Sequence, residues 1–125
     1  MKRTIQHLID DFNEYMDRIV QDSKGTNLKV FAQNKLLQDA MLRRIEILGE
    51  ISKNLPKEFK KKFPDIEWDK ISGTRDRIAH KYDNVNLELV WEIIKREIPL
   101  LKTKFGNAPR DKKSTLISQK KFRRK

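Results

Sequence analysis

The stretch from Arg75 to Tyr82 holds the residues whose types and spacing could do chemistry, and it reads Arg-Asp-Arg-Ile-Ala-His-Lys-Tyr. His80 is the central histidine of the chain, with Arg75 five residues before it and Tyr82 two residues after it. An imidazole can take up and release a proton near neutral pH. A neighbouring carboxylate, such as that of Asp76, can fix its tautomer and favour its charged form. This pattern favours an acid–base catalyst.

The relative placement of these side chains depends on the local backbone. If the segment is helical, Asp76 and His80 are four residues apart and lie on one face. Arg75 then lies about 140° around the helix from His80, at roughly 100° per residue. One helix does not easily aim both side chains at a common point. Either the helix ends near His80, or two copies of the segment face each other and build a shared site.

Length and composition exclude several classes of protein. A chain of 125 residues fits one domain with one core. It has no cysteine, which excludes disulfides and thiolate chemistry, and His7 lies far from His80, so we expect no metal site and no cofactor. We find no apolar run long enough to span a membrane and no secretion signal. We therefore expect a cytoplasmic protein without membrane contact.

The positive charge is concentrated at the C-terminal end. The formal net charge is +11, and residues 106–125 contain eight Lys or Arg against one acidic residue, Asp111. We therefore divide the chain into a helical domain over 1–105 and a basic tail over 106–125. Such a tail suits phosphate-rich or acidic partners.

The apolar residues of the domain recur every three or four positions, which predicts amphipathic helices. We expect a first helix over 4–20 and a second over about 28–54 capped by Asn27. A connector over 55–64 contains a short helical turn and a basic run. A third helix begins near Asp65 and ends in the 75–82 stretch, and a fourth begins after Asn86 and continues to 105, with a kink or a lost hydrogen bond at Pro99. This pattern predicts an all-α, antiparallel bundle of four to five helices.

Six stretches, which make up about half of the chain, carry a resemblance to a known family: Gln38–Ala40, Arg43–Glu50, Phe63–Trp68, Ile71–Tyr82, Val90–Ile94 and Ile98–Leu101. The fourth stretch contains an arginine, then four residues, a histidine, one residue and a tyrosine. This pattern is weak alone but specific in this order and these surroundings. The chain resembles the HepT-like branch of the HEPN family, the higher eukaryotes and prokaryotes nucleotide-binding domain.

The resemblance implies a HEPN-like homodimer in which two motifs line one cleft. It implies the toxin of a type II or type VII-like toxin–antitoxin pair, a metal-independent endoribonuclease acting on tRNA or mRNA. The implied partner is an MNT-type nucleotidyltransferase antitoxin, which in some systems attaches AMP to the motif tyrosine. The motif residues fall on Arg75, His80 and Tyr82. Histidine suits proton transfer during attack of a 2′-OH on phosphate, and a guanidinium suits the developing charge.

Two positions depart from the family pattern. Asp76 stands where many members have asparagine, and a carboxylate accepts hydrogen bonds but cannot donate them as an amide does. Lys81 stands where many members have glycine. We take Arg75, Asp76 and His80 as candidate catalytic residues and Tyr82 as the candidate AMP acceptor. The lysines nearby and in the connector, Lys81, Lys60 and Lys61, are candidates for RNA binding.

Other interpretations stay open. His80 and Arg75 could form ordinary surface ion pairs, Tyr82 could pack its ring at a helix end, and the connector lysines could form a solvated face. His7 is expected to be a surface residue. The chain could then be a non-catalytic module that binds RNA or a nucleotide, or an adaptor that binds a nucleotidyltransferase. Cleavage of RNA by the purified protein separates these classes.

Overall fold

The computed structural model describes residues 4–79 and 85–106. These residues form four helical segments, and the predicted all-α bundle is confirmed. In the described ranges, extended pairing is limited to an isolated bridge between Ala79 and Val85. None of the helices described is both long enough and apolar enough to cross a membrane. The helices are α1 (Ile5–Ser23), α2 (Leu28–Gln33), α3 (Lys35–Asn54), α4 (Lys57–Lys60), α5 (Trp68–Ser72), α6 (Thr74–Ile78), α7 (Leu87–Glu92) and α8 (Ile98–Phe105), with a π-helical turn, Ile93–Glu97, between the last two.

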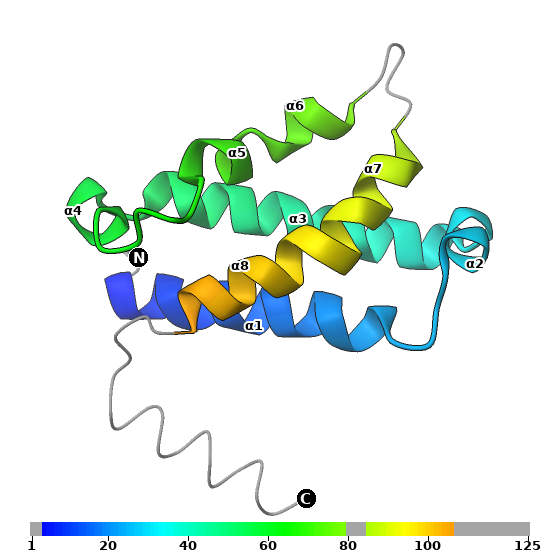
Figure 1. Ribbon diagram of the computed structural model, residues 1–125, viewed down its shortest axis with the longest axis horizontal. Coiled ribbons are helices and arrows are strands. Elements are labelled where there is room, and N and C mark those ends of the chain that lie inside the picture. The colour runs from blue at the N-terminus through cyan, green and yellow to red at the C-terminus, as the bar shows by residue number, and fades with distance from the viewer. Residues whose placement is uncertain (1–3, 80–84, 107–125) are drawn as a thin grey trace, which may run out of the picture.

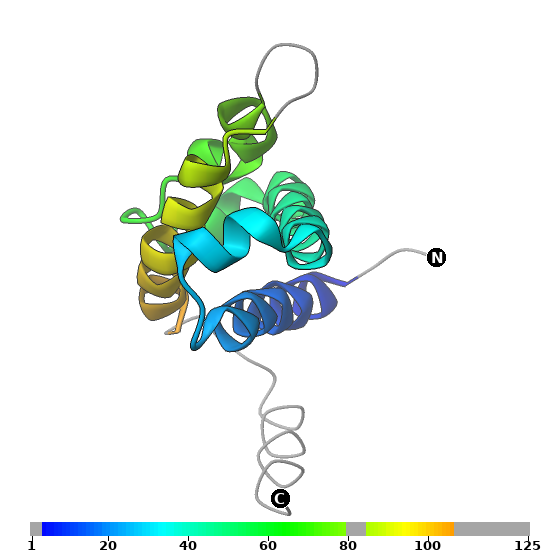
Figure 2. The same ribbon diagram turned by 90° about the vertical axis from the view of Figure 1, so that its right-hand side faces the viewer.

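The helical segments surround one core. α1 and α3 run antiparallel, α5 and α6 lie along α3, and the segment from α7 to α8 crosses above α1 (Figure 1). The end-on view shows α2 crossing one end of the bundle between α1 and α3 (Figure 2). The homodimer expected from the sequence stays a prediction.

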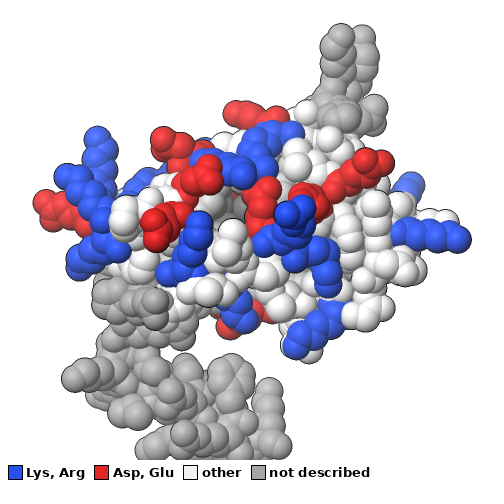
Figure 3. Space-filling model, in the orientation of Figure 1, with Lys and Arg blue, Asp and Glu red and all other residues white. Residues whose placement is uncertain are grey.

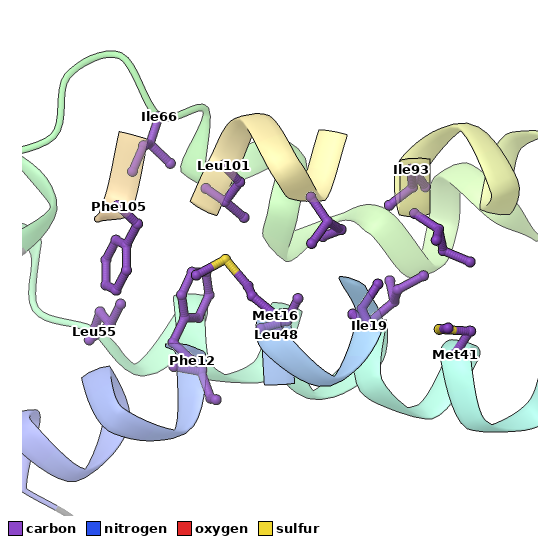
Figure 4. Packing of buried hydrophobic residues seen from close by; sticks show 14 of the residues in the cluster. Phe12, Met16, Ile19, Met41, Leu48, Leu55, Ile66, Ile93, Leu101 and Phe105 are labelled. Atoms are coloured by element: carbon purple, nitrogen blue, oxygen red, sulfur yellow. The ribbon is translucent and has the colours of Figure 1, made fainter. Parts of the chain in front are cut away.

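The core is built from the faces that the helical periodicity predicts. Side chains from α1, α3 and α8 point toward one another in the interior (Figure 4). At the end that holds α4, the Phe105 ring lies 4.8 Å from Phe12, 5.4 Å from Phe63 and 6.0 Å from Trp68, measured between ring centroids. Aromatic contacts of this kind add to the burial of apolar area. They fix the start of α5 against α1 and α8.

The second helical segment differs from the prediction of one helix over 28–54, because Asn34 interrupts it. Asn34 has φ −108° and ψ 89°, and its side chain accepts a hydrogen bond from the Leu37 N–H, which caps α3. The Gln38 amide donates to the carbonyl of Phe31 in the last turn of α2 at 2.8 Å. The Asn34 side chain thus satisfies an N–H group at the start of α3, and the Phe31 carbonyl accepts from both the Asn34 N–H and Gln38. The predicted cap by Asn27 is confirmed, since its side chain accepts from the Val30 N–H.

The fourth segment also begins as predicted, with the Asn86 side chain accepting from the Leu89 N–H. Proline lacks an N–H and its ring crowds the carbonyl four residues earlier. Here the backbone widens just before Pro99, and the Ile98 N–H donates to the carbonyl of Ile93, five residues back. The predicted irregularity at Pro99 therefore takes the form of a π-helical turn.

Gly49 allows α3 and α5 to approach closely. A Cβ atom at this position would lie 3.1 Å from the carbonyl oxygen of Ile71. Beside it, the Ser52 and Ser72 hydroxyl oxygens are 2.6 Å apart and share a hydrogen bond. This glycine therefore serves close helix packing, and the contact fixes the segment that carries Arg75.

We expect Gly49→Ala to destabilise the protein, although alanine is the better helix former by about 1 kcal/mol. The new methyl group meets a backbone carbonyl that already accepts a hydrogen bond from the Thr74 hydroxyl, so the carbonyl cannot move away without loss. Urea unfolding measures the effect. Glu50→Ala, at an exposed position of the same helix, is the control and should stay within about 0.5 kcal/mol of wild type. A more stable Gly49→Ala protein would contradict the close-packing account.

Candidate functional site

The motif begins on α6, which is separated from α5 by Gly73. The buried Thr74 hydroxyl donates to the carbonyls of Lys70 and Ile71, both at 2.9 Å. A threonine hydroxyl that bonds backward in this way competes with the regular helical ladder. The third segment is therefore two short helices, and the one-turn helix α6 carries Arg75 and Asp76.

α6 ends at Ile78, two residues before His80. Ala79 is extended, with φ −76° and ψ 139°, and it pairs with Val85 across the isolated bridge. The Asn86 N–H donates to the carbonyl of Ile78 at 2.8 Å. Backbone contacts thus hold Ile78 and Ala79 beside Val85 and Asn86.

The prediction that the third helix ends within the 75–82 stretch is therefore confirmed, although the segment is divided at Gly73 rather than being one helix. Helical spacing no longer places Asp76 beside His80, because the helix stops between them. Two alternatives were given for the angle that a continuous helix would place between Arg75 and His80. The first alternative, that the helix ends near His80, is confirmed. His80, Lys81 and Tyr82 lie outside the described residues, so their side-chain roles stay predictions.

Arg75 extends from α6 toward α3, where it meets Glu46. Its Nη1 lies 3.8 Å from Glu46 Oε2, and 80% of its side chain is exposed. The other carboxylate oxygen of Glu46 accepts a hydrogen bond from Arg43 Nη1 at 2.7 Å. Asp76 is exposed on the same helix. The candidate catalytic arginine therefore presents its guanidinium group to solvent.

Arg77 forms the firmest polar contact of α6. Its guanidinium group donates two hydrogen bonds to the Glu97 carboxylate, at 3.0 and 2.8 Å, and Lys70 Nζ lies 3.8 Å from the same carboxylate. The hydrogen bonds from Arg77 hold the pKa of Glu97 below its ordinary value, although partial burial opposes this shift. Glu97 likewise raises the pKa of Arg77. This pair joins α6 to the π-helical turn.

The remaining candidates lie on other parts of the surface. Lys60 is half-buried and donates through Nζ to the carbonyl of Ser52 at 2.8 Å, in the last turn of α3. Lys61 is exposed, and His7 is exposed as expected. On the face drawn in Figure 3, basic and acidic side chains are interspersed. RNA binding by Lys60 and Lys61 stays a prediction.

A groove lies beside the Arg77–Glu97 pair. It has a volume of about 90 Å³ and an apolar floor, with Lys70, Glu97 and Lys104 among its lining residues. Arg77 projects to this groove, whereas Arg75, two residues earlier, pairs with Glu46 of α3. The two arginines of α6, Arg75 and Arg77, therefore have different partners.

Sequence reasoning missed Glu46, Arg43 and Glu97 as neighbours of the motif. Arg43 and Glu46 precede Arg75 by about thirty residues and Glu97 follows it by about twenty, so no local spacing relates them. Only the packing of α6 between α3 and the fourth segment brings them together.

Comparison with known proteins identifies the family. Residues 5–106 match the family described as ribonuclease HepT-like. This chain belongs to the HepT-like ribonuclease family. The matched region contains every described helix, and it also contains the Arg75–Tyr82 stretch.

Curated relatives resemble the chain over most of its length. A protein of Methanocaldococcus jannaschii, named as a candidate RNase, is 36% identical over 88% of this chain and 91% of its own length. A candidate RNase of Caldanaerobacter subterraneus subsp. tengcongensis is 37% identical over 78% of this chain and 83% of its own. A protein of Thermococcus cleftensis named as a candidate ribonuclease HepT is 35% identical over 84% and 96%. No solved structure matches the chain significantly.

The Arg77–Glu97 pair predicts a pH-dependent stability. Because the pKa of Glu97 is lowered by folding, its stabilising effect is complete above the ordinary value of 4.5 and is lost as the pH falls through the folded value. We expect Glu97→Gln to lower the free energy of unfolding at pH 7 by about 1.5–3 kcal/mol, the range for hydrogen bonds to charged groups. The difference from wild type should shrink at pH 3.

Urea unfolding at both pH values measures this difference. Glu92→Gln is the matched control, because Glu92 pairs with Arg96 at 2.7 Å in an exposed position. Exposed pairs contribute about 0–1 kcal/mol. A Glu97→Gln effect equal to that of the control, or independent of pH, would contradict the role assigned to the pair.

Proposed function

We propose that this protein is a metal-independent endoribonuclease that cleaves RNA by attack of a 2′-OH on the adjacent phosphate. The observation that carries the proposal is the match to the HepT-like ribonuclease family over residues 5–106, a region that contains Arg75 and His80 in the family's order. The relatives named as candidate RNases support the same activity. Transfer RNA and mRNA are both open as substrates.

The geometry of α6 supports this function. Arg75 is 80% exposed, and its ion pair with Glu46, at 3.8 Å, is too long for a hydrogen bond. Its donors are therefore available to a phosphate from outside the protein. Backbone contacts hold Ile78 and Ala79, the two residues that immediately precede His80. The backbone is thus held in place from Arg75 to Ala79, the residue before His80.

Each group has a defined task in the proposed reaction. A histidine takes the proton of the 2′-OH as its oxygen attacks phosphorus, and a second group returns a proton to the departing 5′-oxygen. The products are a 2′,3′-cyclic phosphate and a 5′-OH. The Arg75 guanidinium stabilises the charge that develops on the phosphate oxygens. In a homodimer, the two copies of His80 divide the acid and base roles.

We further propose that the protein is the toxin of a toxin–antitoxin pair. Its partner is a nucleotidyltransferase antitoxin that neutralises it by attaching AMP to Tyr82. The added phosphate places negative charge two residues from His80, where it repels RNA. If the purified protein leaves RNA intact, the chain is instead a non-catalytic module that binds RNA or a nucleotide, or an adaptor that binds the nucleotidyltransferase.

We expect His80→Ala and Arg75→Ala each to reduce RNA cleavage by at least about 100-fold, the range for loss of an acid–base group or a charge-stabilising donor. Initial rates on a tRNA pool measure the effect. His7→Ala and Arg96→Ala are matched controls, because both residues are exposed and lie outside the motif. Cleavage by His80→Ala at the wild-type rate would contradict the assigned chemistry.

The His80→Ala and Arg75→Ala variants also test whether the site is shared between protomers. If each site takes Arg75 from one protomer and His80 from the other, mixing the two inactive variants forms heterodimers with one intact site. Activity then returns. If each protomer supplies both residues, the mixture stays inactive, and a monomer by light scattering removes the shared cleft altogether.

We expect Tyr82→Phe to keep RNase activity but to escape neutralisation by AMP transfer. Co-expression with the cognate nucleotidyltransferase, followed by intact-mass measurement and growth assays, tests this. Wild type should gain the mass of one AMP unit and lose toxicity. An AMP unit on Tyr82→Phe would place the modification on another residue, and neutralisation of wild type without a mass change would indicate steric blocking.

A further inference from the structure

The Glu46 carboxylate lies between two arginines, one from its own helix and one from the motif. Its Oε1 accepts from Arg43 Nη1 at 2.7 Å, and its Oε2 lies 3.8 Å from Arg75 Nη1. The Glu46 side chain is 35% exposed, whereas those of Arg43 and Arg75 are 69% and 80% exposed. One partly buried anion thus holds two exposed guanidinium groups near each other on the surface formed by α3 and α6.

These contacts orient the two arginines without occupying them. Exposed ion pairs contribute only about 0–1 kcal/mol. A guanidinium group has five N–H donors in a planar fork, and Glu46 engages Arg43 through one nitrogen and Arg75 through none at hydrogen-bond distance. A guanidinium fork binds phosphate through two parallel hydrogen bonds, which are stronger than these contacts.

Other arginines of the described surface are placed differently. Arg18 and Arg96 each pair with a glutamate four residues earlier on the same helix. Arg44, next to Arg43 in the sequence, is only 19% exposed and donates to Asp22 and to the carbonyl of Arg18. Arg43 is the arginine that shares its carboxylate partner with the motif arginine.

We infer that Arg43 and Arg75 bind neighbouring phosphates of one RNA strand, with Arg75 at the phosphate that is cleaved and Arg43 at an adjacent one. The inference rests on the proposed ribonuclease function and assigns a second phosphate-binding residue to the same site. Each guanidinium group can bind one phosphate, and the Glu46 carboxylate between them keeps the two groups apart and oriented before RNA binds. Arg43 contacts RNA without touching the reacting atoms, so it contributes to binding more than to the chemical step.

Salt-dependent RNA binding tests this assignment. Each phosphate contact to a single strand contributes about 0.7 to the slope of log K against log salt concentration. In a His80→Ala background, which binds without cleaving, we expect Arg43→Ala to weaken binding of labelled tRNA roughly tenfold, as for loss of a charged hydrogen-bonded contact. The slope should fall by about 0.7. Arg43→Lys, which keeps the charge, should retain most of the slope.

Arg96→Ala is the matched control, since it removes one similarly exposed arginine whose partner, Glu92, is not the glutamate that Arg43 and Arg75 share. An equal loss of affinity and slope in Arg43→Ala and Arg96→Ala would mean that only net charge matters and would overturn the assignment. A cleavage assay with the chain that keeps His80 separates the proposed ribonuclease function from the phosphate-binding role of Arg43. If that chain cleaves RNA while Arg43→Ala leaves affinity and slope unchanged, the inference fails and the proposed function stands; if it neither binds nor cleaves RNA, the proposed function fails and the inference falls with it.

Discussion

The ion pair between Arg77 and Glu97 is the contact on which the candidate site depends. α6 is a single turn of five residues, which is too short to be stable on its own. Two hydrogen bonds from Arg77 attach it to the π-helical turn, while the close approach at Gly49 attaches the preceding helix to α3. These contacts fix the position of Arg75 between them. The helix that carries the motif is therefore ordered by its neighbours rather than by its own residues.

The irregular features of the fold serve this arrangement. Pro99 forces the backbone to widen before α8, and Glu97 is the last residue of the widened turn. On the other side, Gly73 and the Thr74 hydroxyl end α5 and begin α6. Local backbone exceptions of this kind often occur beside functional sites. Here they occur on both elements that the Arg77–Glu97 pair connects.

Much of the helical architecture could be predicted because its signals are local. Apolar periodicity identified the faces that pack in the core, and Asn27 and Asn86 marked helix starts through their capping side chains. The break at Asn34 was missed because an asparagine within a continuous apolar repeat does not by itself indicate a helix end, although its side chain caps α3 as Asn27 caps α2. The end of α6 was predicted only to within the 75–82 stretch, because its exact position at Ile78 is fixed by pairing with Val85 and Asn86 later in the chain.

The candidate site likewise contains some features that could be predicted from the sequence and others that could not. The residue types of Arg75 and His80, and their order, could be found from the sequence alone, because the motif is contiguous. The expected pairing of Asp76 with His80 assumed a helix that the structure ends at Ile78. Glu46 and Arg43 could not be found by spacing, because packing alone brings α3 against α6. Their placement beside Arg75 extends the site from one short motif to a surface made by two helices.

The central claim is that this protein cleaves RNA through its own side chains by attack of the 2′-OH. Analysis of the fragment ends tests it most directly, with purified protein, a tRNA pool and EDTA in the reaction. The account predicts fragments that end in 2′,3′-cyclic phosphate and begin with 5′-OH. Intact RNA, or fragments with 3′-OH and 5′-phosphate ends that form only when magnesium is added, would contradict it.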